Sequence, residues 1–279
     1  MLNENLKIAF IGGGNMASAI IAGLIKSGHN SKNILVCAPT DKTRNRLSEE
    51  YGVITNQDNS SVLKFADVVI LSVKPYLIKE VCEELVHASN DDHQVIANKL
   101  FMSIAAGVTA QAISSSLNNS PRVVATMPNL PTAIGEGLTG MFAESSCSNT
   151  DKATADDIMN AVGSTVWVES ENAMPAIVAA AGSSPAYFFL FMEAMVKAAI
   201  GQGLDEEGAT NAVMQSAKGA IMLAANSPHS FAELRRQVTS PKGATEQAIN
   251  AFQAGDLDQL VKQAMKSAAA KVEEVYKQI

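Results

Sequence analysis

The segment 238–245 (VTSPKGAT) carries the residue types best suited to holding a small anion. Ser240 is a preferred N-cap residue, and Pro241 fits the first position of a helix. A helix that begins there would present the free backbone N–H groups of residues 243–245 at the positive end of its dipole, which is a receptor for a carboxylate. Taken alone, the segment is more typical of an ordinary Ser-Pro helix start.

A second chemical signal lies near the N-terminus, where the predicted strand 6–11 ends in a glycine cluster. Gly12 and Gly14 match the first two glycines of the pattern G-x-G-x-x-G/A, and Ala17 fills its third place. The first glycine permits a tight turn, the second lets a pyrophosphate approach the backbone, and the small third residue lets helix and strand pack closely. The residues of this turn that we expect to contact a dinucleotide are Gly12, Gly14, Asn15 and Met16.

The second predicted strand, 33–37, bears on the choice of coenzyme. An NAD site usually carries Asp or Glu at this strand end to hold the ribose hydroxyls, and Ala38 cannot do so. The residues that follow and can bind a 2′-phosphate are Thr40, Lys42 and Arg44. The sequence therefore favours NADPH, although Asp41 leaves NADH possible. The alternative is that the two basic residues lie on a solvated helix face.

Two further segments, 66–73 and 100–104, are mostly apolar and are predicted to be buried strands of a parallel sheet. Ligands of such sheets bind at the carboxyl ends of the strands, where small residues let a nicotinamide and its ribose lie against the backbone. The residues that we expect there are Val73, Lys74, Pro75, Ala105, Ala106 and Gly107, with Asn59 and the Pro-bracketed Asn129 as further contacts. Lys74 has the alternative of being a surface charge only.

The composition limits the class of protein. The chain has 279 residues, of which 47% are hydrophobic, and a formal charge of −7 without any Lys/Arg run. Nucleic acid and anionic membrane surfaces are therefore not expected as partners. The three cysteines form no C-x-x-C pair, so neither a disulfide framework nor a metal site is expected. With no basic n-region and no uninterrupted apolar run long enough to span a bilayer, we expect a cytoplasmic protein.

The chain divides by character into two predicted domains. Residues 1–169 alternate between strands and helices up to a final strand at 164–168, which is typical of an α/β Rossmann-type dinucleotide-binding domain. Residues 170–279 contain only helical patterns and predict an all-α domain. One of its helices, 187–200, is apolar on nearly every side and must therefore be buried. A helical dimer interface explains this best, and burial in the core of one chain is the alternative.

Six motifs in order resemble the pyrroline-5-carboxylate reductase family over nearly the whole chain. They are the stretches 10–17 (FIGGGNMA), 73–75 (VKP), 103–108 (SIAAGV), 127–129 (MPN), 182–188 (GSSPAYF) and 238–245 (VTSPKGAT). The resemblance implies NAD(P)H-dependent reduction of 1-pyrroline-5-carboxylate to L-proline, the last step of proline biosynthesis. It also implies self-association through the C-terminal helices, as a homodimer or a ring of dimers such as a decamer.

The resemblance also implies roles for the late segment. The substrate carboxylate would lie on the backbone N–H groups of Gly243, Ala244 and Thr245. The Thr245 hydroxyl would hydrogen-bond the ring nitrogen, which makes Thr245 the candidate catalytic residue. Ser240 would shape the loop and contribute to substrate binding.

The chain departs from the family pattern at several positions. The family usually has a small residue, commonly glycine, at the position of Lys242, and glycine at Ser184. It often has arginine at Ala125, and Gln or His at Tyr76. If position 242 requires a positive φ, a lysine strains it, while its ammonium could strengthen carboxylate binding.

Two other functions compete with this interpretation. A β-hydroxy acid dehydrogenase shares the plan of a Rossmann domain followed by helices, but Lys197 comes too late in its helix to match the catalytic lysine of such enzymes. A catalytically weakened, NADP-binding regulatory protein is the other alternative, and the residues at 242 and 184 favour it most.

Overall fold

The computed structural model describes residues 3–90, 93–118 and 122–276. These form two compact units, a sheet unit (Met1–Ser183 with Ala268–Ile279) and a helical unit (Ser184–Ser267). The strands are β1 (Ile8–Ile11), β2 (Ile34–Cys37), β3 (Ile54–Asn56), β4 (Val68–Leu71), β5 (Leu100–Ser103), β6 (Val123–Met127), β7 (Gly137–Ala143) and β8 (Gly163–Trp167). The predicted boundary between a dinucleotide-binding domain (1–169) and a helical dimerisation and substrate-binding domain (170–279) stays a prediction.

Helices alternate with the strands up to β8, and only helices follow after it. Those of the sheet unit are α1 (Asn15–Lys26), α2 (Asp41–Tyr51), α3 (Val62–Phe65), α4 (Ile78–Ala88), α5 (His93–Ala97), α6 (Ala110–Ser116), α7 (Asn149–Asn160) and α8 (Met174–Ile177). The later helices are α9 (Ser184–Gly201), α10 (Glu206–Ala225), α11 (Phe231–Gln237), α12 (Ala244–Ala254) and α13 (Leu257–Tyr276). The short helices are η1 (Ser31–Asn33), η2 (Asn59–Ser61), η3 (Pro75–Leu77), η4 (Leu130–Ile134), η5 (Glu171–Ala173) and the π-helix η6 (Val178–Gly182).

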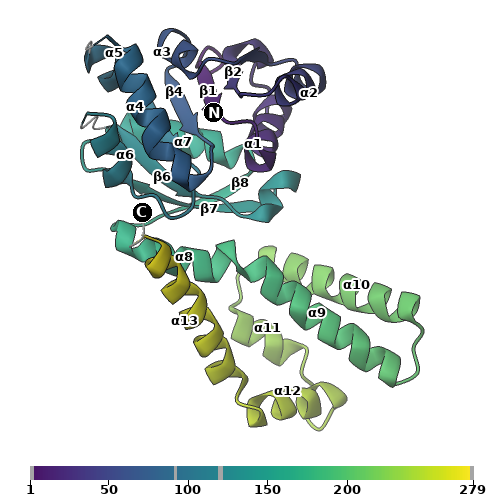
Figure 1. Cartoon of the computed structure of the whole chain (residues 1–279). Coiled ribbons are helices and arrows are strands. Elements are labelled where there is room, and N and C mark those ends of the chain that lie inside the picture. The colour runs from purple at the N-terminus through teal and green to yellow at the C-terminus, as the bar shows by residue number, and fades with distance from the viewer. Residues whose placement is uncertain (1–2, 91–92, 119–121, 277–279) are drawn as a thin grey trace. The chain divides into compact units, whose positions relative to one another are not determined.

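The sheet has the order β3-β2-β1-β4-β5-β6-β7-β8 (Figure 1). Its first six strands are parallel and have the order of a dinucleotide-binding fold, so the predicted Rossmann-type domain is confirmed. β7 runs antiparallel to β6, and β8 is again parallel to β7. All strands β1 to β6 therefore present their carboxyl ends at one edge of the sheet.

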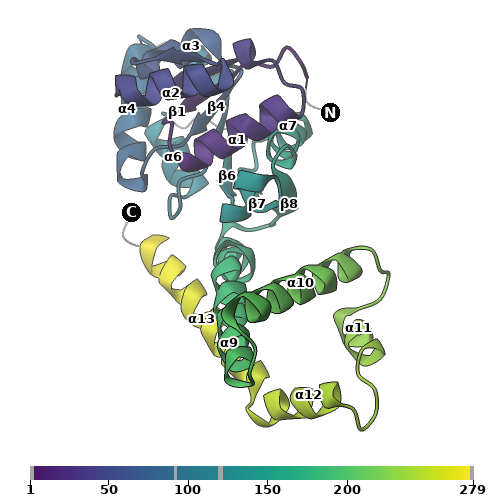
Figure 2. The same ribbon diagram turned by 90° about the vertical axis from the view of Figure 1, so that its right-hand side faces the viewer.

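Helices cover both faces of the sheet, with α1 and α7 on one face and α4 and α6 on the other (Figure 2). Side chains alternate along a strand, so Ile8 and Phe10 of β1 pack with the first group, and Ala9 and Ile11 pack with the second. All four residues are fully buried. Burial on both faces explains why the strands read as continuous apolar runs in the sequence.

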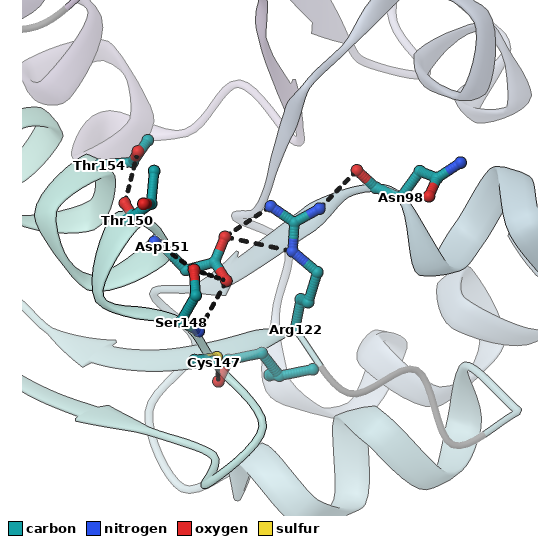
Figure 3. Close-up of polar contacts among 8 residues, drawn as sticks. Asn98, Arg122, Cys147, Ser148, Thr150, Asp151 and Thr154 are labelled. Carbon is teal, nitrogen blue, oxygen red and sulfur yellow. Dashed lines mark hydrogen bonds and ion pairs between the residues drawn. The ribbon is translucent and has the colours of Figure 1, made fainter.

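An ion pair ties the amino end of β6 to the first turn of α7 (Figure 3). Arg122 donates from Nη2 and Nε to Oδ1 of Asp151, at 2.5 and 3.1 Å, and from Nη1 to the carbonyl of Asn98 at 2.7 Å. The other carboxylate oxygen accepts from the Ser148 hydroxyl and backbone N–H at 2.8 and 2.9 Å, which completes a capping box. The Asp151 side chain is 5% exposed, so its carboxylate has little contact with water.

Replacing this carboxylate, Asp151→Asn, should lower the free energy of unfolding at pH 7 by about 2–3 kcal/mol, because it leaves the Arg122 charge without its partner. We place the loss near the lower end of the usual range because the Arg122 side chain is 33% exposed and water can solvate part of its charge. Urea unfolding at one fixed protein concentration measures it. The control is Asp41→Asn, which breaks the Arg44–Asp41 pair, and since Asp41 is 85% exposed, the cost there should be below about 1 kcal/mol. Equal losses in both variants would contradict this account.

The same pair should give the stability a pH dependence. Burial alone would raise the pKa of Asp151, but hydrogen bonds from Arg122 and Ser148 outweigh it and hold the pKa below its usual value. The stabilisation is therefore present above about pH 4 and is lost as the pH falls through the lowered pKa of the folded state. The difference between wild type and Asp151→Asn should accordingly shrink in urea titrations below about pH 4.

The helical unit exposes an unusual amount of apolar surface. α9 and α10 form a helical hairpin, and the rings of Phe191 in α9 and Phe252 in α12 lie 5.8 Å apart. None of the α9 residues is buried, and Phe188 and Leu190 are 60% and 67% exposed. The alternative that α9 lies in the core of one chain is therefore wrong, and its exposed face has the character of a surface that another molecule covers.

By length and composition, one helical stretch among the described residues, Glu171–Gly201, could cross a membrane. Its mean hydropathy is 1.4, and 28% of its most apolar window is buried. A helix that packs against a second protein chain has the same composition, so this property does not distinguish the two environments.

Candidate active site

The turn between β1 and α1 requires glycine at its first position. Gly12 has φ +104°, and its N–H donates to the carbonyl of Cys37 at 2.8 Å. A Cβ at this position would lie 2.5 Å from the carbonyl oxygen of Ser72, which follows β4. The close approach of β1 and β4 at this point therefore excludes any side chain.

The start of α1 is open to an anion. Gly14 is its N-cap residue, and no side chain of the described residues caps it. A Cβ at Gly14 would meet none of the described atoms within 4 Å, so the space in front of the first turn is free. The first backbone N–H groups of the helix, on Asn15 and Met16, can therefore donate to a phosphate.

Arg46 was missed by the sequence analysis and lies next to this turn. Its Nη2 donates to the carbonyl of Gly13 at 3.2 Å and to the hydroxyl of Ser18 at 3.1 Å, while Nη1 pairs with Glu50. The guanidinium thus braces the glycine turn from α2 and places a positive charge beside it. Spacing alone could not reveal this role, because the contact joins residues 33 positions apart.

The predicted 2′-phosphate residues lie where β2 leads into α2. Thr40 is the N-cap of α2 and accepts from the Thr43 N–H at 3.4 Å. The Arg44 guanidinium donates to the carbonyl of Ala38 at 2.5 Å and forms an ion pair with Asp41. Lys42 is exposed. Arg44 therefore already lies across the end of β2, held by the carboxylate of its neighbour.

The sheet brings the remaining predicted coenzyme residues of β3, β4 and β5 to the same edge. The residues that follow β4 are Val73, Lys74 and Pro75, with Lys74 exposed, and those that follow β5 are Ala105, Ala106 and Gly107. Asn59 follows β3, and its Nδ2 donates to the Glu84 carboxylate of α4 at 2.9 Å. The predicted coenzyme-binding residues that follow β1 to β5 thus all lie at one edge of the sheet.

Asn129, which follows β6, has its side chain engaged within the protein. Nδ2 donates to the carbonyl of Ala181 in η6 at 3.0 Å, and Oδ1 accepts from the N–H of Leu138 in β7 at 2.9 Å. The residue is 8% exposed. Its side chain therefore fixes the loop after β6 against β7 and η6. Because both polar atoms of the side chain are used, Asn129 would contact the coenzyme through its backbone.

A small cavity of about 110 Å³ adjoins this edge. It is lined by Ala106 and Gly107 after β5, by Met127 at the end of β6, and by Val272 and Tyr276 of α13. Burial raises the pKa of Tyr276 to about 12, so its hydroxyl stays protonated. The sequence analysis did not find Tyr276, because nothing in the pattern of a C-terminal helix indicates which residues return to the sheet.

In the helical unit, the turn before α12 differs from the prediction. Gly243 is the N-cap of α12, so the helix begins three residues later than the predicted Ser240 N-cap implies. The reason is a β-turn over 240–243, closed by the Gly243 N–H, which donates to the Ser240 carbonyl at 3.0 Å. Pro241 at its second position and a left-handed third residue are features of a type II turn.

The turn changes which amides are free. The Gly243 N–H is used within the turn, so its predicted direct contact with a carboxylate is replaced by a role in holding the turn. Ala244 and Thr245 open the helix, and no side chain of the described residues caps it. Both residues are exposed, and the nearby Glu246 carboxylate accepts from the Lys242 N–H at 2.8 Å. In this unit the groups left open to an anion are therefore the first amides of α12, with the exposed Thr245 as its second residue.

Lys242 occupies the left-handed position of the turn, with φ +60°. This conformation costs a residue with a Cβ about 1–2 kcal/mol relative to glycine. The expectation that a lysine is strained here is therefore confirmed. Of the other departures, Ala125 is 5% exposed in β6, Tyr76 is 77% exposed in η3, and Ser184 is the first residue of α9.

In the described part of the chain, no three His, Cys, Asp or Glu side chains are placed to hold a metal ion. The three cysteines are buried, and burial raises the pKa of Cys37 to about 11 and of Cys82 to about 12. These thiols are therefore protonated at neutral pH and unreactive.

Each of the two parts of the chain matches the model of a known protein family. Residues 171–275 match the family described as pyrroline-5-carboxylate reductase dimerisation, and residues 7–107 match that described as NADP oxidoreductase, coenzyme F420-dependent. The chain therefore binds a nicotinamide dinucleotide in its sheet unit and carries a dimerisation domain. That domain supports self-association.

Relatives extend the match to the full length. A pyrroline-5-carboxylate reductase of Vibrio alginolyticus is 42% identical over 98% of this chain and 99% of its own. A solved pyrroline-5-carboxylate reductase of Coxiella burnetii is 40% identical, with a TM-score of 0.92 over 97% of this chain and 98% of that one. The Plasmodium falciparum enzyme, solved with NADP bound, is 25% identical, with a TM-score of 0.81 over 98% and 99% of the two chains. The dehydrogenase of β-hydroxy acids is accordingly not favoured, and the chain belongs to the pyrroline-5-carboxylate reductase family.

Proposed function

We propose that this protein catalyses the NADPH-dependent reduction of 1-pyrroline-5-carboxylate to L-proline in the cytoplasm. The observation that carries the proposal is the full-length match to pyrroline-5-carboxylate reductases, in a chain that keeps an open glycine turn and an uncapped start of α12. The glycine turn supplies donors for the pyrophosphate, and α12 supplies donors for a carboxylate.

The reaction needs little acid–base catalysis by protein side chains. NADPH, held by the glycine turn, would supply a hydride from C4 of its nicotinamide to form the new C–H bond at the imine carbon. The electron pair of the C=N bond moves to the nitrogen, which already carries its proton in the iminium form. Because a protonated cyclic imine is electrophilic by itself, the protein accelerates the step mainly by holding the two reactants in place.

The residues at the start of α12 would orient the substrate. The N–H groups of Ala244 and Thr245 bind the carboxylate at the positive end of the helix. The Thr245 hydroxyl hydrogen-bonds the ring nitrogen and so sets which face of the ring is presented. Ser240 and Gly243 hold the turn in which these groups lie, through the 3.0 Å hydrogen bond between them.

We further propose that NADPH is preferred over NADH. Thr40 and Arg44 lie at the end of β2, where a 2′-phosphate would replace the Asp41 carboxylate as the partner of the Arg44 guanidinium. Arg44→Ala should therefore lower the ratio of kcat/KM for NADPH to that for NADH by at least about tenfold, through the NADPH value. Lys32→Ala is the matched control, because Lys32 bonds the Gly52 carbonyl elsewhere on the surface. An unchanged ratio in Arg44→Ala would remove Arg44 from coenzyme selection.

The exposed apolar surface of α9 supports a homodimer, and we propose that dimers assemble further into a ring such as a decamer. Light scattering on the purified protein measures the mass of the assembly. A monomer at micromolar concentration would contradict this part of the proposal.

Steady-state oxidation of NADPH, followed by its absorbance, tests the activity itself. Addition of pyrroline-5-carboxylate should start oxidation and produce L-proline in equal amount. 3-Hydroxyisobutyrate with NAD should give no reduction of the coenzyme. Tight NADPH binding without turnover would favour the regulatory alternative and contradict the proposal.

A further inference from the structure

One face of α2 packs directly on the glycine turn between β1 and α1. A Cβ at Gly13, the middle residue of the glycine cluster, would lie 2.7 Å from both Thr43 Cγ2 and Leu47 Cδ1. Gly13 is therefore needed for the close approach of α2, which is a requirement separate from that of any ligand. Thr43, Arg46 and Leu47 are three and four positions apart in α2, so Arg46 shares this face of the helix.

Arg46 brings a positive charge to this contact. Its Nη2 donates to the carbonyl oxygen of Gly13 at 3.2 Å and to the hydroxyl of Ser18, in the first turn of α1, at 3.1 Å. Ser18 is 8% exposed, whereas the Arg46 side chain is 44% exposed. Glu50, one turn further along α2, pairs with Nη1 at 3.2 Å. The guanidinium is thus held beside the turn through both of its Nη atoms.

The carbonyl of Gly13 and the N–H of Gly14 belong to one peptide group. In a trans peptide these two bonds point in opposite directions. Because the Gly13 carbonyl accepts from Arg46, the Gly14 N–H points away from α2. This N–H donates to none of the described residues, and a Cβ at Gly14 would meet none of the described atoms within 4 Å. The Gly14 N–H is therefore free to bind an anion in front of α1.

A cation on the carbonyl side of this peptide strengthens anion binding on its N–H side. A hydrogen bond to the carbonyl oxygen polarises the peptide and makes its N–H a stronger donor. A phosphate oxygen that accepts from Gly14 would lie about 8 Å from the Arg46 guanidinium, given the usual peptide and hydrogen-bond lengths. For a partly exposed charge at that distance, the Coulomb attraction corresponds to about a three- to tenfold change in affinity.

Arg46 and Arg44 act on different parts of the coenzyme. The Arg44 guanidinium lies at the end of β2, where a 2′-phosphate would replace Asp41 as its partner. Arg46 instead contacts the turn that faces the pyrophosphate, which NADPH and NADH share. A contribution from Arg46 should therefore not depend on the 2′-phosphate.

We propose that Arg46 is a positioning residue for the pyrophosphate of the coenzyme, that it acts through the Gly13–Gly14 peptide, and that it contributes equally to the binding of NADPH and NADH. The inference rests on the proposed placement of the pyrophosphate on the glycine turn. Ser18 and Glu50 keep the guanidinium on the carbonyl side of the peptide, so its charge acts on the anion without touching it.

Calorimetric titration of Arg46→Met with each coenzyme tests the proposal. The Kd should rise by about three- to tenfold for NADPH and for NADH alike, whereas Arg44→Ala should affect NADPH alone. Arg46→Lys keeps a positive charge and a donor and should restore most of the affinity. The control is Lys32→Met, which removes a charge bonded to the Gly52 carbonyl and should change either Kd by less than about twofold. Unchanged Kd values in Arg46→Met, or a loss for NADPH alone, would overturn the proposal.

Two further readouts separate this role from a general loosening of α2. 2′-AMP carries the 2′-phosphate but lacks the pyrophosphate, and its Kd follows from displacement of NADPH, measured by NADPH fluorescence. Arg46→Met should leave this Kd within about twofold of wild type, because Arg44 and its helix stay in place. The loss of NADH affinity in Arg46→Met should also shrink as salt rises from about 20 mM to about 0.5 M, since partly exposed charges are screened. Weaker binding of 2′-AMP, or a loss that is independent of salt, would overturn the proposal.

These titrations are made without pyrroline-5-carboxylate, so they do not depend on turnover. Wild-type protein that binds NADPH but does not reduce pyrroline-5-carboxylate would contradict the proposed function and leave the Arg46 result intact. Conversely, Arg46→Met protein that binds both coenzymes as wild type does would overturn the role of Arg46 and leave the reductase activity standing.

Discussion

Gly14→Ala should leave the free protein as stable as wild type and yet weaken NADPH binding by at least about tenfold, or roughly 1.4 kcal/mol. A Cβ at Gly14 meets none of the described atoms within 4 Å, and its φ of −74° suits any residue, so the fold has no need of this glycine. The only reason to require it is the close approach of a pyrophosphate to the backbone. Calorimetric titration of NADPH and thermal unfolding without ligand measure the two effects separately.

Gly12→Ala is the contrasting variant two residues away. Its Cβ would lie 2.5 Å from the Ser72 carbonyl oxygen, and φ +104° is strained for alanine. We therefore expect both a lower melting temperature of the free protein and loss of NADPH binding. If Gly14→Ala bound NADPH as wild type does, the pyrophosphate would not lie on this turn, whatever the behaviour of Gly12→Ala.

Thr245→Ala should lower kcat/KM for pyrroline-5-carboxylate by at least about tenfold, which corresponds to roughly 1.4 kcal/mol of transition-state stabilisation. The variant removes the hydroxyl that we assign to the ring nitrogen, and it leaves the backbone N–H groups for the carboxylate in place. Binding of NADPH should be unchanged, because the coenzyme residues lie in the sheet unit. Initial rates at several concentrations of each substrate measure both quantities.

Three further variants serve as comparisons for Thr245→Ala. Thr245→Ser keeps the hydroxyl and should retain most of the activity. Ser267→Ala removes an exposed hydroxyl of α13, which bonds the Gln263 carbonyl at 3.0 Å, and should have no effect. Ser240→Ala should also lower the rate if the hydroxyl shapes the turn. If neither Thr245→Ala nor Ser240→Ala lowers kcat/KM by about tenfold, the substrate lies elsewhere.

The sequence predicted best the features that depend on local geometry. The glycine pattern at 12–14 places β1, the turn and α1 correctly, because a tight turn with a positive φ needs glycine. Strands buried on both faces, such as β4 and β5, stand out as continuous apolar runs. β3 was missed because it has three residues and is an exposed edge strand. β7 was missed because it lies in a stretch whose glycines read as loop.

Several features of the candidate site could not be predicted from short stretches of sequence. Ser240 and Pro241 have the residue types of a helix start, but a β-turn uses both and moves the start of α12 to Ala244. Arg46 and Asn129 act through contacts with residues far away in the sequence, which spacing cannot reveal. The apolar pattern of α9 correctly indicated a surface that one chain leaves uncovered, because such a helix has no polar face to present to water.

The most direct measurement of the central claim is a crystal structure of the protein with NADP⁺ and tetrahydro-2-furoate, an unreactive ring analogue of the substrate. The account predicts that the analogue's carboxylate accepts hydrogen bonds from the Ala244 and Thr245 N–H groups, and that its ring carbon faces C4 of the nicotinamide. An analogue bound at another place, with the first amides of α12 open to solvent, would contradict it.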